Sequence, residues 1–139
     1  MIKQIVVSGK RKRAVAKATV KEGEGKILIN KKSYLQLNML DRLRIEEPVR
    51  IAKEQIPDLK FSIEVSVSGG GKSGQIEASR LAIARALVEI AKEQTGKAEQ
   101  LRKSYIAYDR NLLVADTRRK EAYKPGDSKA RKKRQKSYR

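Results

Sequence analysis

The sequence predicts a small α+β domain that ends in a long basic tail. Short runs that alternate apolar and polar residues, typical of strands, occupy much of the first half of the chain. One long amphipathic segment, typical of a helix, follows them. The end of the chain is dominated by Lys and Arg. We therefore expect a globular body over residues 1–116 and an extended C-terminal tail over residues 117–139.

Four segments carry strand patterns. Ile2–Val7 is a short apolar run, and Ala14–Lys21 places small apolar residues at every second position. Lys26–Asn30 contains three consecutive aliphatic residues. The glycine-containing turn Glu22–Gly25 between these last two predicts a β-hairpin. Lys60–Ser68 alternates most regularly, which indicates a strand with one buried face.

The residues between the strands predict two short helices. Ser33 can cap a helix that runs to Leu37 or beyond, because its hydroxyl can accept a free backbone N–H. Pro48 fits the first turn of the other helix, with Glu46 and Glu47 at its positive end.

The clearest helix spans about Gln75–Gln94, where Ile and Leu form one apolar stripe widened by Ala. Alanine keeps the helix thin, so it can lie close against a sheet. Gly96 suits the left-handed cap beyond its end, and Lys92 lies near its negative end. A shorter helix around Lys97–Tyr105 and a last strand at Leu112–Ala115 complete the body.

The net charge restricts the class of partner. Lys and Arg number 34 against 16 Asp and Glu, which gives +18 and a pI near 10.3. Such a surplus repels itself in the compact state, and a polyanion relieves that repulsion. Nucleic acid is the first candidate and an anionic membrane surface the second. Without a long apolar run or the features of a signal peptide, we expect a cytoplasmic protein and no membrane partner.

The absence of Cys and His excludes whole classes of site. Disulfides, zinc sites built from Cys or His, and Ser-His or Cys-His catalysis are ruled out. Composition alone still allows an all-carboxylate Mg²⁺ site. Asp109 and Asp116 are not spaced as an acid–base pair, and salt bridges to the abundant cations are the better interpretation. We therefore expect no enzyme, no cofactor and no metal.

Two internal segments are candidates for contact with RNA. Lys10–Arg13 places four consecutive cations between strands, and in so basic a chain this favours phosphate binding over a merely solvated loop. Gly69–Gln75 joins a strand to a helix and invites a P-loop interpretation. The spacing fails, because Ser66 stands where a Walker A loop needs Gly. Either the glycines allow a tight turn, or the free N–H groups and Lys72 bind one phosphate.

The tail holds half of the net charge. Thr117–Arg139 carries eleven Lys or Arg against two acids and almost no aliphatic residues. Such a segment cannot build a core and is expected to order only on RNA. At about 3.3 Å per residue it spans roughly 70 Å when extended. Tyr138 can stack on a base and Arg139 can grip a phosphate. By composition alone, a nonspecific polycation or a nuclear address stays open.

Three segments together resemble a known family. Gly69–Leu87 shows three glycines, a Gln and small residues before the cation Arg85, and Gly9–Ala16 with Gly23–Asn30 looks like that family's N-terminal block. Lys129–Arg139 looks like its tail. On these residues the chain resembles the universal small-subunit ribosomal protein nine family, in its archaeal and eukaryotic form.

The resemblance implies a fold and a place. The fold is α+β, with a mixed four-stranded sheet, helices on one face and a left-handed βαβ crossover, as in the second domain of ribosomal protein five. That handedness breaks the usual rule. The implied role is structural, in the head of the small ribosomal subunit, on the 3′ major domain of its RNA and beside other head proteins. The tail is implied to reach the peptidyl-site transfer RNA.

These inferences predict two groups of contact residues. The residues expected to bind ribosomal RNA are Lys10, Arg11, Lys12, Arg13, Lys72, Arg118, Arg119, Lys120, Lys129, Arg131, Lys132, Lys133 and Arg134. The residues expected to contact transfer RNA are Lys136, Tyr138 and Arg139.

Overall fold

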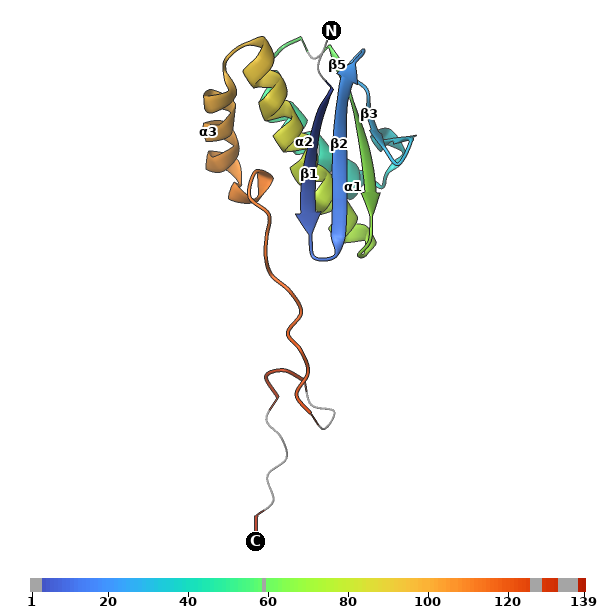
Figure 1. Ribbon diagram of the computed structural model, residues 1–139, viewed down its shortest axis with the longest axis vertical. Coiled ribbons are helices and arrows are strands. Elements are labelled where there is room, and N and C mark those ends of the chain that lie inside the picture. The colour runs from blue at the N-terminus through green and yellow to red at the C-terminus, as the bar shows by residue number, and fades with distance from the viewer. Residues whose placement is uncertain (1–3, 59, 126–128, 133–137) are drawn as a thin grey trace.

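The computed structural model describes residues 4–58, 60–125, 129–132 and 138–139, and these form a mixed sheet packed against helices (Figure 1). The strands are β1 (Ile5–Arg11), β2 (Ala14–Glu22), β3 (Ile27–Ile29), β4 (Lys32–Ser33) and β5 (Phe61–Ser68). The helices are α1 (Met39–Lys53), α2 (Lys72–Gln94) and α3 (Ala98–Tyr108), with single 3-10 turns η1 (Tyr34–Gln36) and η2 (Arg110–Leu112).

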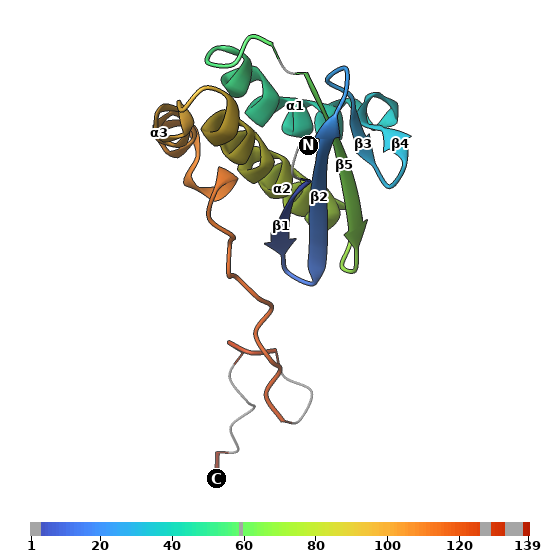
Figure 2. The same cartoon turned by 45° about the horizontal axis from the view of Figure 1, so that its top comes forward.

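The sheet has the order β1-β2-β5-β3-β4, and only β3 and β5 pair in parallel. Helices α1 and α2 lie on one of its faces (Figures 1 and 2). The predicted α+β class and mixed sheet are confirmed. The sheet has a fifth strand in addition to the predicted four, the two-residue β4. It forms because Asn30 and Lys31 both adopt positive φ and turn the chain back onto β3. The crossover from β3 through α1 to β5 is present, while its left-handedness and the likeness to ribosomal protein five stay predictions.

The predicted hairpin between residues 14–21 and 26–30 is wrong. Strand β5 lies between β2 and β3, and β2 pairs instead with β1 through the two-residue turn Lys12–Arg13. The sequence pattern indicates strands but not their neighbours. The eight-residue β5 buries Ile63, Val65 and Val67, and it pairs along its whole length with β2, which the three-residue β3 cannot do.

The predicted helix boundaries need two corrections. Pro48 lies inside α1 rather than in its first turn, because α1 begins at Met39. The bond lost at the proline is offset by burial, since Pro48 packs in the interior together with Ile45 and Ala52. Leu112–Ala115 forms no strand. Asp109 accepts the N–H of Asn111 at 2.9 Å and starts the turn η2, which buries Leu112.

Two further boundaries differ from the prediction. The strand predicted at Ile2–Val7 is β1, which covers Ile5–Arg11 in the described residues, so Lys10 and Arg11 belong to a strand. The helix predicted from Ser33 to Leu37 or beyond is the single turn η1. Ser33 caps η1 by accepting the Leu35 N–H at 3.4 Å, and β5 covers Phe61–Ser68. Helix α2 begins at Lys72, three residues before the expected start, and Gly96 beyond its end has φ 66°. Helix α3 begins within one residue of the expected position and runs on to Tyr108.

Helix α2 lies unusually close to the sheet. The inward side chains of β2 are mainly Ala, and the alanines of α2 that face them are fully buried. On β1, a Cβ added at Gly9 would lie 2.4 Å from the carbonyl oxygen of Ala78 and 2.7 Å from the nitrogen of Ala82. The backbones of β1 and α2 are therefore in direct contact at Gly9, as the thin alanine surface of the helix allows.

This contact predicts a large effect for a small substitution. Gly9→Ala must push β1 away from α2, and we expect the free energy of unfolding to fall by about 1–3 kcal/mol. Urea unfolding followed by circular dichroism measures it. Gly71→Ala is the matched control, because nothing lies within 4 Å of a Cβ built there, and it should cost no more than about 1 kcal/mol as an N-cap alanine. Equal losses for both variants would contradict the close contact.

Candidate nucleic-acid interface

Three segments that are far apart in the sequence meet at one end of the body. The β1–β2 turn, the glycine loop before α2 and the beginning of the tail line a hollow of about 870 Å³. Its lining residues are Arg11, Lys12, Arg13, Gly70, Gly71, Arg118, Arg119 and Lys120. Six of these eight are cations, and none of the described lining residues is acidic. The fold thus brings two of the predicted cationic segments, the one at the β1–β2 turn and the one at the beginning of the tail, to one place.

The β1–β2 turn presents its cations through a strained backbone. Lys12 adopts φ 52°, a left-handed conformation that costs a non-glycine residue about 1–2 kcal/mol. The ladder on either side, which pairs Arg11 with Ala14, leaves only two residues to reverse the chain. Lys12 and Arg13 are both exposed at the tip of this turn. The strain is therefore imposed by the paired strands, and it places two adjacent cations at the hollow.

The glycine loop packs directly against that turn. Gly69 and Gly70 have φ 77° and 64°. Cβ atoms at these positions would lie 2.6 Å from the Arg13 carbonyl oxygen and 2.9 Å from the Ala14 nitrogen. Both glycines are required by conformation and by space, which supports the tight-turn interpretation. Gly71 meets neither demand, so its bare backbone lies open at the hollow.

Lys72 lies apart from the other predicted cations. Its Nζ is 3.8 Å from Asp41 of α1, and it is not among the residues that line the hollow. The side chain is largely exposed, so this surface pair contributes little to stability. The predicted contact of Lys72 with ribosomal RNA therefore stays a prediction, without support from the clustering of its neighbours.

Arg11 is engaged inside the protein. Its Nε donates to Glu77 of α2 at 2.6 Å, and its Nη1 lies 3.2 Å from an Asp116 carboxylate oxygen. The Arg11 side chain is only 18% exposed, whereas Lys10 beside it is exposed and lines a smaller hollow of mixed charge. Of the four predicted cations in this segment, Lys12 and Arg13 are the two that lie at the rim of the large hollow without a described ion pair.

The two acidic residues singled out in the sequence form salt bridges, as predicted. Asp109 pairs with Arg80 at 3.0 Å. Asp116 accepts the backbone N–H of Arg118 at 3.0 Å, and this bond is the main cause that holds the pKa of Asp116 below its usual value. The charges of Arg11, Arg118 and Lys12 lower that pKa further. Asp116 therefore stays charged beside the cationic hollow.

Beyond Asp116 the chain leaves the body (Figures 1 and 2). Residues 117–125 are all exposed, and Lys120 lies 4.7 Å from the centre of the Tyr123 ring. Arg131 pairs with Glu121 at 2.7 Å, and both side chains are exposed to solvent. Lys129, Lys132, Tyr138 and Arg139 are exposed, Tyr138 by 86%. The predicted contacts Lys133, Arg134 and Lys136 lie outside the described residues.

Over residues 4–58 and 60–125 and the short described stretches of the tail, no three acidic residues are grouped so that they could hold a metal ion. None of the described helices combines the length and the apolar character that crossing a membrane requires.

Two partly buried arginines were not predicted as functional residues from the sequence. Arg80 joins Glu47 of α1, at 2.5 Å, to Asp109 before η2. Arg85 appeared only as the last cation of the glycine-loop motif, and in the structure it bonds to the backbone where the tail begins. Their partners are 28 to 77 residues away in sequence, so no local spacing could have indicated them.

Comparison with known proteins agrees with this basic surface. The family described as ribosomal protein S9/S16 matches residues 9–139. Small ribosomal subunit protein uS9 of Methanococcus maripaludis strain C5 is 44% identical, and those of strains C7 and S2 are each 43% identical. Each alignment covers 99% of this chain and 100% of the relative. The chain therefore belongs to the ribosomal protein S9/S16 family, whose members are structural ribosomal proteins and not enzymes.

Proposed function

We propose that this small-subunit ribosomal protein binds ribosomal RNA of the subunit head, in the 3′ major domain, through the cationic hollow, and that its tail reaches the peptidyl-site transfer RNA. The observation that carries the proposal is the convergence of six cations on one hollow, three from the end of β1 and its turn and three from the beginning of the tail. Counterion release drives such a surface onto a phosphate backbone. The protein acts as a scaffold in the cytoplasmic ribosome, beside other proteins of the head.

The arrangement of the hollow suits a nucleic-acid backbone. Lys12 and Arg13 approach it from the β1–β2 turn, and Arg118–Lys120 approach it from the tail. A strand of phosphates that enters between them meets cations from both sides. Gly71 adds no side chain, so phosphates can come close to its backbone. Contacts of this kind position the protein on RNA and do not read sequence.

The tail extends this interface away from the body. Residues 117–125 are exposed, and the whole segment 117–139 carries eleven Lys or Arg against two acids. We treat 1–116 as the docking body and 117–139 as a segment that orders along RNA. At its end, the exposed ring of Tyr138 can stack on a base and the Arg139 guanidinium can bind a phosphate with two parallel bonds, with Lys136 as a neighbour.

Removing the cations of the turn tests the hollow. Lys12→Gln with Arg13→Gln removes two phosphate contacts, so the slope of log K against log salt should fall by about 1.4–1.8. A transcript of the 3′ major domain titrated at several KCl concentrations measures it. Lys97→Gln with Lys103→Gln is the matched control, because both lysines are exposed on or beside α3, away from the hollow. A slope that falls equally in both pairs would show that the hollow has no special role.

Shortening the tail tests its two parts separately. Deleting 129–139 should leave the melting temperature of the body unchanged, lower the salt slope by several units and weaken retention of transfer RNA on small subunits. Deleting only Arg139 should lower that retention while the slope for ribosomal RNA changes by less than about 1. Filter binding of labelled transfer RNA to reconstituted subunits measures retention. An unchanged slope after the longer deletion would exclude residues 129–139 from RNA binding.

A further inference from the structure

We propose that Arg85 and Arg11 are positioning residues that hold the tail root, Leu113–Asp116, against the body and thereby direct Arg118–Lys120 to the hollow. The inference rests on the proposed function, because it concerns how the tail is presented to RNA. It gives a role to the cation that ends the glycine-loop motif, which the hollow itself does not use.

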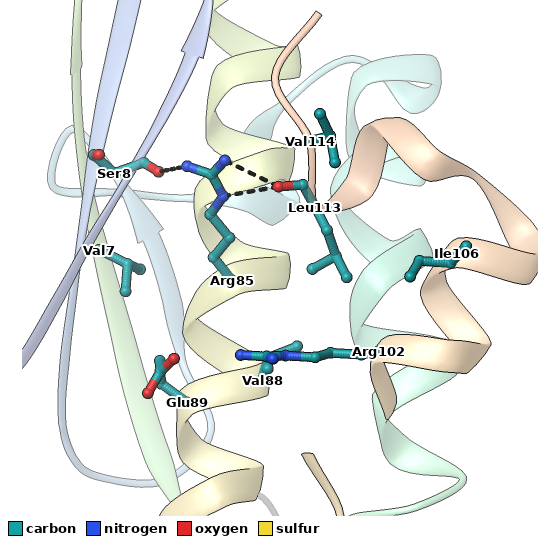
Figure 3. A pocket seen from close by; sticks show the side chains of 9 residues that line it. All are labelled: Val7, Ser8, Arg85, Val88, Glu89, Arg102, Ile106, Leu113 and Val114. Atoms are coloured by element: carbon teal, nitrogen blue, oxygen red, sulfur yellow. Dashed lines mark hydrogen bonds between the residues drawn. The ribbon is translucent and has the colours of Figure 1, made fainter. Parts of the chain in front are cut away.

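Arg85 joins two backbones that are distant in sequence. Its guanidinium extends from α2 into the gap between β1 and the tail root (Figure 3). Nη1 donates to the carbonyl oxygen of Ser8 at 2.7 Å, while Nε and Nη2 donate to that of Leu113 at 3.0 and 2.9 Å. Because the guanidinium donates all three hydrogen bonds to backbone carbonyl oxygens, these bonds fix the path of the chain itself. The paired bonds to Leu113 also fix the direction of that carbonyl.

Arg11 makes a second attachment to the tail root, at Asp116, three residues after Leu113. Its Nε is held by Glu77 of α2 at 2.6 Å, and its Nη1 faces Asp116 at 3.2 Å. Asp116 in turn accepts the N–H of Arg118 through its other oxygen. The side chains of Arg11 and Asp116 are 18% and 19% exposed, so water screens this pair less than an open surface pair. The chain of contacts thus ends on the first cation that the tail contributes to the hollow.

The two attachments lie at the boundary between the buried end of the body and the exposed tail. Leu112, just before them, is fully buried, and residues 117–125 after them are all exposed. A tail that left the body through a free hinge would point in many directions and would lose that freedom on binding RNA. A root held at Leu113 and Asp116 has already lost part of this conformational freedom before RNA binds. The entropy cost of binding is therefore smaller, and binding is favoured without any added phosphate contact.

Distances between spin labels on the free protein test the attachment. The chain contains no Cys, so labels at Lys17→Cys on β2 and Ala122→Cys in the tail are unique. Both positions are exposed. We expect Arg85→Gln and Asp116→Asn each to broaden the distance distribution about twofold or more. Arg85→Lys, which keeps the charge and one donor group, should restore part of the narrow distribution.

Controls separate positioning from folding. Arg102→Gln is matched to Arg85→Gln, because Arg102 and Arg85 line one pocket of about 530 Å³ (Figure 3), but Arg102 pairs only with Glu99 among the described residues. It should leave the distribution unchanged, and the melting temperature of each variant should show a folded body. Asp116→Asn decides the question if Arg85→Gln does not fold, because Asp116 lies outside the core. An unchanged distribution in Asp116→Asn and in every folded Arg85 variant would overturn the proposal.

Binding to the same RNA transcript gives the second readout. For Arg85→Gln we expect affinity to fall about 3–10-fold at each salt concentration with the salt slope unchanged, because the phosphate contacts still form once the tail is bound. A slope lowered by about 0.7–0.9 would show a direct phosphate contact and overturn the positioning role. If the unaltered protein bound RNA without salt dependence, the proposed function would fail, while the label distances would still report on the root.

Discussion

The direct contact between the backbones of β1 and α2 at Gly9 is the constraint on which the rest of the structure depends. A side chain at Gly9 would collide with the backbone at Ala78 and Ala82, so only glycine on the strand and short residues on the helix allow this approach. The approach brings the Arg85 guanidinium within 2.7 Å of the Ser8 carbonyl, one residue from Gly9. Because the tail root bonds to the same guanidinium, the path of the tail is set by the packing of the core.

The fold divides the positive charge between two uses. Arg11, Arg80 and Arg85 form ion pairs and hydrogen bonds within the protein, where they join helices, sheet and tail root. Cations on the turn and the tail stay exposed and line the hollow. Partly buried pairs keep their strength in salt better than exposed ones, so the internal set can hold the body together under conditions that weaken RNA binding. A count of Lys and Arg therefore overstates the number of RNA ligands.

Local patterns predicted those parts of the molecule that local physics decides. Alternation in residues 61–68, the alanine-rich stripe of α2 and the left-handed Gly96 each depend on a few neighbouring residues, and each was confirmed. Strand neighbours could not be predicted, because β5 joins β2 across a gap of about 40 residues that no periodicity records. The cationic segments of the site were found from charge alone. The internal role of Arg11 was not, since its partner Glu77 is 66 residues away.

Because the tail root is held and residues 117–125 are exposed, we expect the tail to lose less conformational freedom when it binds RNA. In the proposed function, the tail is a tethered ligand once the hollow is on RNA, and its effective concentration depends on the volume that it can explore. Attachment at Leu113 and Asp116 removes directions that lead away from the hollow, while the exposed residues beyond keep their reach. The body and the tail can then bind RNA nearly as one unit. A freely hinged tail of the same charge would instead be free to contact any nearby phosphate.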